Sequence, residues 1–213
     1  MRRAWLQYEK KDAAVYISHL DFVRAMNRTL RRGGVPVAYS QGFNPHPLLS
    51  FVLPLSVGVT SECELLVLDL AHDITAAELV EAANRAAAPG IRVLAAGEVT
   101  DNKMFKNVRY AVYRVTPERM PPPGQIKAFL AQKAIVVDKR TKSGVKPTDI
   151  RPDILSISDD FSMVLSAGSV ANLKPQTVIE AMAEWAPGFC RFHRTAILDE
   201  AFTQLPGGAP YGH

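Results

Sequence analysis

"CELLVLDLAHDITAAELVEAANRAAAPGIRVLAAGEV", residues 63–99, shows the succession of strands and helices most clearly. Its first eight residues are apolar nearly throughout, which is typical of a central strand. Thr75 and Glu78 then form a T-x-x-E capping box that opens a helix, and the pair Pro89 and Gly90 ends this helix before a second strand. The segment therefore predicts a strand, a helix and a strand in succession.

The residues before this segment extend the pattern toward the N-terminus. We expect a first strand over "RAWLQYEK" and a helix over residues 18–34, with Ser18 as its N-cap and glycine past its end. Two more strands are expected over "VPVAYS" (35–40) and "LLSFVLPL" (48–55). The order strand, helix, two or three strands, helix, strand is that of the split βαβ, or ferredoxin-like, plan.

The second half of the chain repeats this order of elements. Helices are expected over 125–132 and after Pro175, and strands over 108–115, 134–140, 154–158, 161–167 and 190–200. The sequence thus predicts an α+β protein of two tandem ferredoxin-like units, in which helices pack on one face of each antiparallel sheet. We expect the units to span residues 1–100 and 107–202, and residues 203–213 to form a flexible tail.

The composition is that of a soluble globular protein. The 213 residues include 25 Lys and Arg against 21 Asp and Glu, and the net charge of +4 favours anionic partners. No run approaches the ~18 apolar residues of a membrane span, and the N-terminus does not resemble a signal peptide, so we expect a cytoplasmic protein without a membrane partner. Its two cysteines are too few for an iron–sulfur cluster, which takes about four thiolates.

The first predicted helix has one apolar side and one basic side. At 100° per residue its apolar side chains face the sheet, namely Phe22, Val23, Met26 and Leu30. The opposite side carries Arg24, Arg28, Arg31 and Arg32. Guanidinium groups spaced in this way can meet successive phosphates of a nucleic acid. The alternative interpretation is an ordinary solvated helix face.

A second basic cluster surrounds a Ser-Gly turn within residues 138–151. It consists of Lys139, Arg140, Lys142, Lys146 and Arg151. An exposed basic loop of this kind is suited to contact with a polyanion. Alternatively, its lysines keep the edge of a polar β-hairpin soluble.

The segment "SQGFNPHP" (40–47) is predicted to be a stiff corner of the chain. The residues of this corner are Gly42, Phe43, Asn44, Pro45 and His46. Each proline favours extended geometry in the residue before it, and glycine permits a positive φ. In one interpretation Phe43 and His46 point outward, where flat rings can stack on bases. In the other, Phe43 fills the core beneath the corner and Asn44 caps its backbone.

His19 and His46 are the candidate catalytic residues. Two nearby histidines could act as base and acid in RNA cleavage through the 2′-hydroxyl. With Asp21 they could also surround a metal, but the H-x-D pattern is weak and no metal site is predicted. The sequence has no Walker loop, G-x-G-x-x-G, G-x-S-x-G or C-x-x-C motif, so no cofactor is predicted and the balance favours a non-enzyme.

Four blocks of the sequence resemble the radical-SAM-linked protein family, a domain of unknown function. They are "YISHLD" (16–21), "YSQGFNPHP" (39–47), "LSFVLPLSVGVTSECE" (49–64) and "TKSGVKPTDIRP" (141–152). Members of that family occur beside, or fused to the C-terminal side of, radical SAM proteins. The resemblance therefore implies a radical SAM protein as partner, but no reaction and no catalytic residues. Because the chain lacks C-x-x-x-C-x-x-C, it is not expected to be the radical enzyme itself.

The predicted plan also resembles that of another group of proteins. Tandem ferredoxin-like units with a basic face occur in endonucleases that process CRISPR repeat RNA, some of which carry a histidine on the first helix, where His19 stands here. This analogy concerns the fold and transfers no function.

Three functions follow as hypotheses. The leading one is a non-catalytic RNA-binding or substrate-presenting partner of a radical SAM enzyme that modifies RNA, with tRNA or rRNA as the nucleic acid. The second is a metal-independent ribonuclease or RNA-modifying enzyme that uses His19 and His46. The third is a protein–protein adaptor in which the corner at residues 40–47 docks a radical SAM protein.

Overall fold

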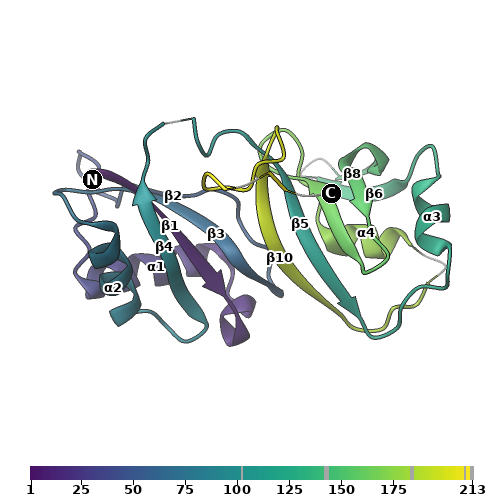
Figure 1. Ribbon diagram of the computed structural model, residues 1–213, viewed down its shortest axis with the longest axis horizontal. Helices are drawn as coiled ribbons and strands as arrows, with labels where there is room; N and C mark the ends of the chain where they lie inside the picture. Colours follow the sequence, from purple (N-terminus) through teal and green to yellow (C-terminus); the bar gives the residue numbers. More distant parts are fainter. Residues whose placement is uncertain (102, 142–143, 183–184, 209, 212–213) are drawn as a thin grey trace. The chain divides into compact units, whose positions relative to one another are not determined.

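The computed structural model describes all residues of the chain except 102, 142–143, 183–184, 209 and 212–213. The chain forms two compact units, Met1–Asn107 and Val108–His213. Each unit combines antiparallel strands with a few helices, so the predicted α+β class is confirmed (Figure 1). No helix in the described part of the chain is long and apolar enough to cross a membrane.

The first unit is built on an antiparallel sheet with the order β4-β1-β3-β2. Its elements are β1 (Arg3–Lys10), η1 (Asp12–Tyr16), α1 (His19–Gly33), β2 (Leu49–Phe51), β3 (Val59–Asp69), α2 (Ala76–Arg85) and β4 (Ile91–Glu98). In the middle of the sheet, Leu6 of β1 lies opposite Leu66 of β3 and Ala96 of β4.

The two helices of this unit cover one face of its sheet (Figure 1). Because side chains alternate along a strand, every second residue of β1 points toward these helices. The core contains Ala4, Leu6, Tyr8, Leu66 and Leu68 from the sheet, Phe22, Met26 and Leu30 from α1, and Leu79, Ala82 and Ala83 from α2. The burial of apolar surface in this core is the main contribution to the stability of the packing between helices and sheet.

Local signals place the starts of both helices and the end of α1 correctly, whereas α2 ends at Arg85, before the Pro89-Gly90 pair that was expected to stop it. The Ser18 hydroxyl accepts a hydrogen bond from the Asp21 backbone N–H at 3.2 Å, and Gly34 ends α1 with φ of +79°. At α2 the Thr75 hydroxyl accepts from the Glu78 N–H at 3.2 Å, and the Glu78 carboxylate accepts from the Thr75 N–H at 2.9 Å. The predicted capping box is therefore confirmed.

Replacement of Thr75 by alanine is expected to lower the free energy of unfolding by about 1 kcal/mol, a typical value for the loss of an N-cap. Urea denaturation measures the change, and Thr75→Ser, which keeps the hydroxyl, is the control. Hydrogen bonds from Thr75 hold the pKa of Glu78 below its ordinary value. The ionised carboxylate therefore stabilises the fold above its ordinary pKa, and this contribution disappears as the pH falls through the lowered pKa. A Thr75→Ala protein as stable as wild type at pH 7 would contradict the assignment.

The crossing of α1 and α2 leaves no room for a side chain at Gly33. A Cβ atom at this position would overlap the backbone carbonyl of Ala82. We expect Gly33→Ala to destabilise the protein by about 2 kcal/mol, because overpacking forces the helices apart. Thermal denaturation measures this effect, and Arg28→Ala on the exposed side of α1 is the control. Equal melting temperatures for the two variants would show that the helices can separate without cost.

Three sequence predictions for strands of the first unit need correction. Residues 35–40 form no strand, and only single bridges join Val37 to Leu70 and Tyr39 to Pro47. Pro36 has no N–H to donate to a ladder, which explains why extended pairing does not develop. The strand predicted over 48–55 is reduced to β2, and the strand predicted over 63–70 begins four residues earlier, at Val59.

The second unit has an antiparallel sheet with the order β10-β5-β9-β8 and a separate two-stranded ribbon, β6–β7. Its elements are β5 (Val108–Pro117), α3 (Gln125–Leu130), β6 (Val136–Thr141), β7 (Gly144–Asp149), η2 (Arg151–Asp153), β8 (Ile154–Ile157), β9 (Ser162–Ser166), α4 (Pro175–Ala181) and β10 (Cys190–Asp199). The predicted strand at 134–140 corresponds to β6, which pairs with β7 and not with the main sheet.

The segment after β10 makes backbone hydrogen bonds to its neighbours. The Leu205 N–H donates to the carbonyl of Ile197 at 2.9 Å, and the Tyr211 N–H donates to that of Phe202 at 2.8 Å. Leu205 is buried, and the rings of Phe202 and Tyr110 stack 4.5 Å apart. These contacts attach part of residues 203–213 to the second unit.

Candidate nucleic-acid interface

The basic side of α1 is exposed to solvent. Its arginines are all exposed, whereas Phe22, Met26 and Leu30 on the opposite side are buried. Val23, which was assigned to the apolar side, is half-buried. The helical period therefore predicted the orientation of the arginine face, which we define as Arg24, Arg28, Arg31 and Arg32.

The four guanidinium groups of the arginine face differ in their contacts. Arg24 pairs with the Asp21 carboxylate at 2.9 Å, and Arg32 donates to the carbonyl of Ala86 at 3.0 Å. Hydrogen bonds from Ser18 and Arg24 lower the pKa of Asp21, so its carboxylate stays ionised and paired with Arg24. In the described part of the chain, Arg28 and Arg31 make neither an ion pair nor a hydrogen bond through their side chains. They are therefore the two guanidinium groups best placed to bind an external anion.

The corner at residues 40–47 is a short closed loop. The Ser40 N–H donates to the carbonyl of His46 at 2.9 Å, and the Leu48 N–H donates to that of Ala38 at 2.8 Å. Gly42 has φ of +126°, a conformation that other residues rarely adopt. The predicted turn is present, and backbone hydrogen bonds close its base.

Phe43 lies at the surface of this loop with its whole ring in solvent. Its exposure is 106 % of the reference value, the highest of the exposed large apolar residues in the described chain. The interpretation in which Phe43 fills the core is therefore wrong. Asn44 makes no hydrogen bond within the described residues, and Ser40 takes the capping role that was assigned to it. An exposed aromatic ring on a stiff loop is a suitable platform for stacking on a base.

His46 belongs to the base of the loop. The Ser40 hydroxyl accepts from the His46 backbone N–H at 3.1 Å and lies 2.8 Å from its Nδ1 atom. The imidazole lines a hollow of about 180 Å³ together with Ser50 and the pair formed by Arg3 and Asp69, whose Nε and Oδ1 atoms are 3.3 Å apart. His46 is thus held by Ser40 and lines the same hollow as a cation and an anion.

His19 has different surroundings. Its ring meets that of Phe51 edge-on at 5.5 Å, and it lines a small hollow with Tyr8, Lys10 and Phe22. This hollow shares no residue with the one that His46 lines. Asp21, the third catalytic candidate, pairs with Arg24. The structure thus does not bring the two histidines together in either hollow.

Lys10 is a residue that the sequence reasoning missed. It is buried, with its Nζ atom 4.7 Å from the centre of the Phe22 ring and 3.3 Å from the carbonyl oxygen of Ile17. Burial lowers its pKa, and the nearby Glu64 partly offsets this shift. The alternation of β1, in which Ala4, Leu6 and Tyr8 point inward, could have located Lys10 on the buried side.

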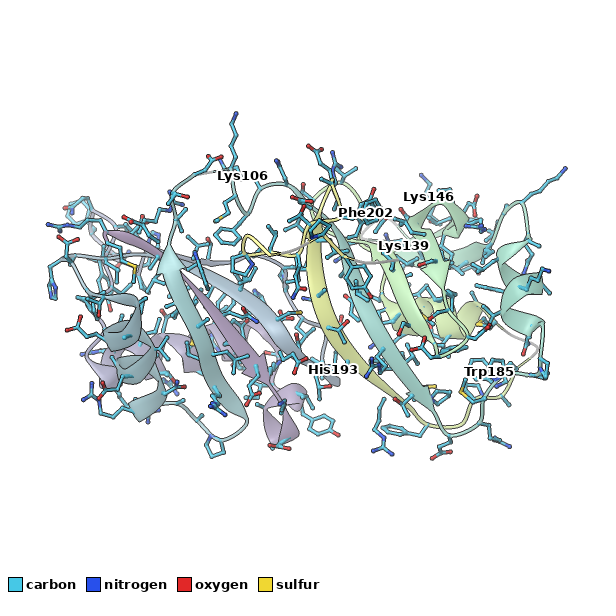
Figure 2. All side chains as sticks on the ribbon, viewed as in Figure 1. Lys106, Lys139, Lys146, Trp185, His193 and Phe202 are labelled. Carbon is cyan, nitrogen blue, oxygen red and sulfur yellow. The ribbon has the colours of Figure 1, made fainter. Side chains whose placement is uncertain are left out.

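The ribbon β6–β7 carries part of the second basic cluster. Lys139 of β6 lies directly opposite Lys146 of β7, and Arg140 lies opposite Val145 (Figure 2). All three basic side chains are exposed. Like charges in direct cross-strand register repel each other, and a bound anion would relieve this repulsion. Lys142, which was also assigned to the cluster, lies outside the described residues.

Arg151, the fifth basic residue of that cluster, has a structural role. Its Nε donates to the carbonyl of Leu130 at 2.9 Å and one terminal nitrogen donates to that of Ile154 at 3.0 Å. A hollow of about 750 Å³ lies beside the ribbon, and its walls include the acidic residues Asp153 and Glu180 as well as basic groups. The ribbon is therefore a weaker candidate for anion binding than the arginine face.

The described residues contain no cluster of three or more histidine, cysteine, aspartate or glutamate side chains that could hold a metal ion. Cys63 is buried and Cys190 is half-buried, and neither forms a disulfide. The arginine face is suited to binding through its charge, and the corner is suited to binding through stacking on its exposed ring.

Fold and surface together define an α+β protein of two units with exposed basic side chains on both. Residues 3–175 match the family described as "Uncharacterized protein conserved in bacteria (DUF2344)", and the chain belongs to this family. A comparison with curated proteins found no match. Among solved structures, the crystal structure of an unknown protein from Galdieria sulphuraria aligns with 86% of this chain and 90% of that chain, at 14% identity. The TM-score of 0.28 is too low to support an argument about the fold.

Proposed function

We propose that the protein binds RNA without cleaving it, and that the arginine face of α1 makes the main contact. The observation that carries this proposal is the presence of two exposed guanidinium groups, Arg28 and Arg31, that lack partners in the described chain. Arginine binds phosphate through a planar pair of N–H donors, and its positive charge releases counterions from a polyanion. Asp21 is the acid next to this face, and its carboxylate already pairs with Arg24.

The corner at residues 40–47 would add contacts to bases. Phe43 offers both faces of its ring, and the closed loop limits the entropy that is lost when the ring stacks. Stacking on unpaired bases favours single-stranded segments, such as the loops of tRNA or rRNA. Phosphate contacts through α1 and stacking through Phe43 would then act in the same unit.

We further propose that both units are ferredoxin-like. The strand order β4-β1-β3-β2 of the first unit and the order β10-β5-β9-β8 of the second support this assignment. In the first unit β1 pairs with β4 and β3, and in the second unit β5 pairs with β10 and β9. In each sheet the first strand along the chain therefore lies between the last strand and the third strand, as a split βαβ plan requires. The ribbon β6–β7 would then be an insertion between α3 and β8.

The partner that we propose is a radical SAM protein, for which the chain would present or position the RNA. This rests on the resemblance of the blocks at 16–21, 39–47, 49–64 and 141–152 to the radical-SAM-linked family. Catalysis by His19 and His46 receives less support, because these side chains line separate hollows. The adaptor hypothesis keeps one observation in its favour, because Phe43 could equally insert into a pocket of a partner protein.

Fluorescence anisotropy with a labelled single-stranded oligoribonucleotide and with tRNA tests the proposal. We expect saturable binding with the RNA intact at the end of the titration, both with and without EDTA. Cleavage that is lost in His19→Ala would instead establish the ribonuclease. Absence of binding, together with nuclease-resistant co-purification of a radical SAM protein that Phe43→Ala abolishes, would establish the adaptor.

A further inference from the structure

The outer edge of β6, on the side away from β7, offers unpaired backbone groups. Residues of an antiparallel pair point their N–H and C=O groups alternately toward the partner strand and away from it. The Ile150 N–H donates to the Ile135 carbonyl at 2.8 Å, so every second residue from Ile135 onward points its groups toward β7. The residues that point outward are Val136, Asp138 and Arg140. In the described part of the chain, no hydrogen bond joins their backbone to a segment outside the ribbon.

Other sheet edges of the protein are closed by specific groups. At the outer edge of β4, the side-chain amide of Asn84 donates to the Val93 carbonyl and accepts from the Val93 N–H, both at 2.8 Å. At the outer edge of β7, Pro147 lies opposite Asp138 and has no N–H to donate. Such features prevent the addition of a further strand. The outer edge of β6, whose backbone the structure describes throughout, has neither feature over its six residues.

The hollow of about 750 Å³ beside the ribbon runs along this edge. It is lined by five consecutive residues of β6, from 136 to 140, whose side chains alternate between the two faces of the ribbon. A hollow over one face alone would meet only every second residue. Its other walls are formed by residues 170–174 and by α4, through Thr177, Glu180 and Ala181 (Figure 1). The space is therefore a groove between the edge of β6 and α4.

The size of this groove corresponds to one extended segment. Five residues of a strand extend over about 16 Å, and a strand occupies about 4.8 Å across a sheet and about 10 Å between layers. One such segment fills roughly 800 Å³, which is close to the volume of the groove. Val136 and Val170 in its walls are 63% and 75% exposed. An added strand would therefore bury apolar surface that now faces solvent.

The charges around the groove limit the kind of strand that can be added. Lys139 lies opposite Lys146 of β7, so two like charges repel each other across the ribbon (Figure 2). A carboxylate opposite Lys139 on the added strand would offset this repulsion. Two residues away on the same face, Val137 is half-buried and favours an apolar neighbour. Because Asp153 and Glu180 also line the groove, a single acid among apolar residues suits it better than a polyanion.

A second copy of β6 is a poor partner for this edge. When two copies of one strand pair in antiparallel fashion about a twofold axis, the registers with the longest overlap are centred on Asp138 or on Lys139. The first register places Asp138 opposite its own copy, and the second places Lys139 opposite its own copy. Both bring like charges into direct cross-strand register, which is unfavourable. The edge is therefore better matched to a different chain.

We propose that this groove binds an extended peptide segment of a partner protein, which adds to β6 as a third strand of the ribbon. The segment carries an acidic residue opposite Lys139 and an apolar residue two positions away, opposite Val137. Backbone hydrogen bonds to the outward residues of β6 provide affinity, and the alternating side chains provide specificity. This inference goes beyond RNA binding, because none of these residues belongs to the arginine face or the corner.

Backbone amide exchange in the full chain, measured by ¹⁵N–¹H NMR without RNA, tests this proposal. The probe is acetyl-Thr-Val-Thr-Glu-Thr-Val-Thr-amide, whose pattern is the same in both strand directions. At a peptide concentration of about four times Kd, we expect amide exchange at Asp138 and Arg140 to slow about fivefold. The Lys139 amide already points toward β7 and should keep its rate. The peptide with Lys in place of Glu should bind about tenfold more weakly.

Two methylated forms of the probe separate backbone pairing from attraction between side chains. One is N-methylated at its Thr residues, and the other at Val and Glu. We expect one form to lose binding and the other to keep it, because alternate N–H groups of a strand face its neighbour. Loss in the Thr form indicates an antiparallel strand, and loss in the Val and Glu form indicates a parallel strand. Equal binding of both forms would overturn the proposal.

Two protein variants complete the test. Asp138→Pro removes the central N–H of the edge, as Pro147 does on β7, and should abolish protection of the Arg140 amide. Lys139→Glu keeps every backbone group and should prefer the Lys peptide to the Glu peptide, which tests the proposal even if Asp138→Pro does not fold. Unchanged exchange at Asp138 with both peptides at millimolar concentration would overturn it.

Two other results would assign the edge of β6 to a different partner and would also overturn the proposal. Protection that rises with protein concentration alone would indicate a second copy. Protection by an oligoribonucleotide and not by the peptide would indicate RNA. Since the peptide titrations contain no RNA, their failure is distinguishable from a failure of RNA binding by α1.

Discussion

The double variant Arg28→Gln/Arg31→Gln is expected to bind single-stranded RNA about 25-fold more weakly than wild type at 0.1 M salt. Each phosphate contact to single-stranded nucleic acid releases about 0.7 counterions, which corresponds to about fivefold in affinity at this salt concentration. Two lost contacts therefore multiply to about 25-fold. Anisotropy titrations with a labelled oligoribonucleotide measure the change. Arg28 and Arg31 are exposed, and their side chains make no hydrogen bond or ion pair in the described chain, so the melting temperature should not change.

The matched control for this variant is Arg92→Gln/Arg119→Gln. Arg92 lies on β4 and Arg119 follows β5, and both side chains are exposed. Each double variant removes two cations and lowers the net charge from +4 to +2. If both variants lose the same affinity, net charge and not the arginine face attracts RNA.

Phe43→Ala is expected to weaken the binding of single-stranded RNA by about 1–3 kcal/mol, the usual contribution of one stacked base. The effect on a duplex of the same length should be small, because paired bases are already stacked. The melting temperature of the protein should stay unchanged, since the Phe43 ring contributes nothing to the core. Anisotropy with single-stranded and duplex probes measures both affinities.

Phe189→Ala is the control for the stacking prediction, because Phe189 is also exposed, at 63%, but lies in the second unit. An unchanged RNA affinity in Phe43→Ala would remove the stacking role. Loss of a radical SAM partner in the same variant would then assign Phe43 to protein docking.

The parts of the fold that were predicted from the sequence are those set by local chemistry. Ser18 and the capping box at Thr75 fix the starts of α1 and α2, because each hydroxyl satisfies a backbone N–H within three residues of itself. The exposure of the arginine face follows from the helical period and from the apolar residues on the other side. The antiparallel pair β8–β9 was likewise expected from the short turn that joins its strands.

The remaining features depend on contacts that are distant in sequence. Residues 35–40 have the composition of a strand, but they find only single bridging partners. The first residues of β3, Val59 to Glu62, include polar side chains, and only the pairing of Ser61 with Lys10 of β1 shows that the strand starts there. The ribbon β6–β7 separates from the main sheet for the same reason, since local pattern does not specify which strands pair.

The candidate site was predicted in part. Proline and glycine indicated a stiff corner. These residues restrict the backbone and not the direction of a side chain, so they do not predict that Phe43 points outward. His19 and His46 line separate hollows because the sheet and its loops place them apart. A separate hollow beside α4 is lined by Gln176, Trp185 and residues of β10, and no sequence motif indicates it.

The dependence of RNA affinity on salt concentration tests whether RNA binds through the arginine face. We predict that the logarithm of the association constant falls linearly with the logarithm of the salt concentration for wild type. For Arg28→Gln/Arg31→Gln the slope should be shallower by about 1.4, the sum of two phosphate contacts. The control Arg92→Gln/Arg119→Gln should keep the wild-type slope. A wild-type affinity that does not change with salt, or an identical slope in Arg28→Gln/Arg31→Gln, would contradict RNA binding through the arginine face.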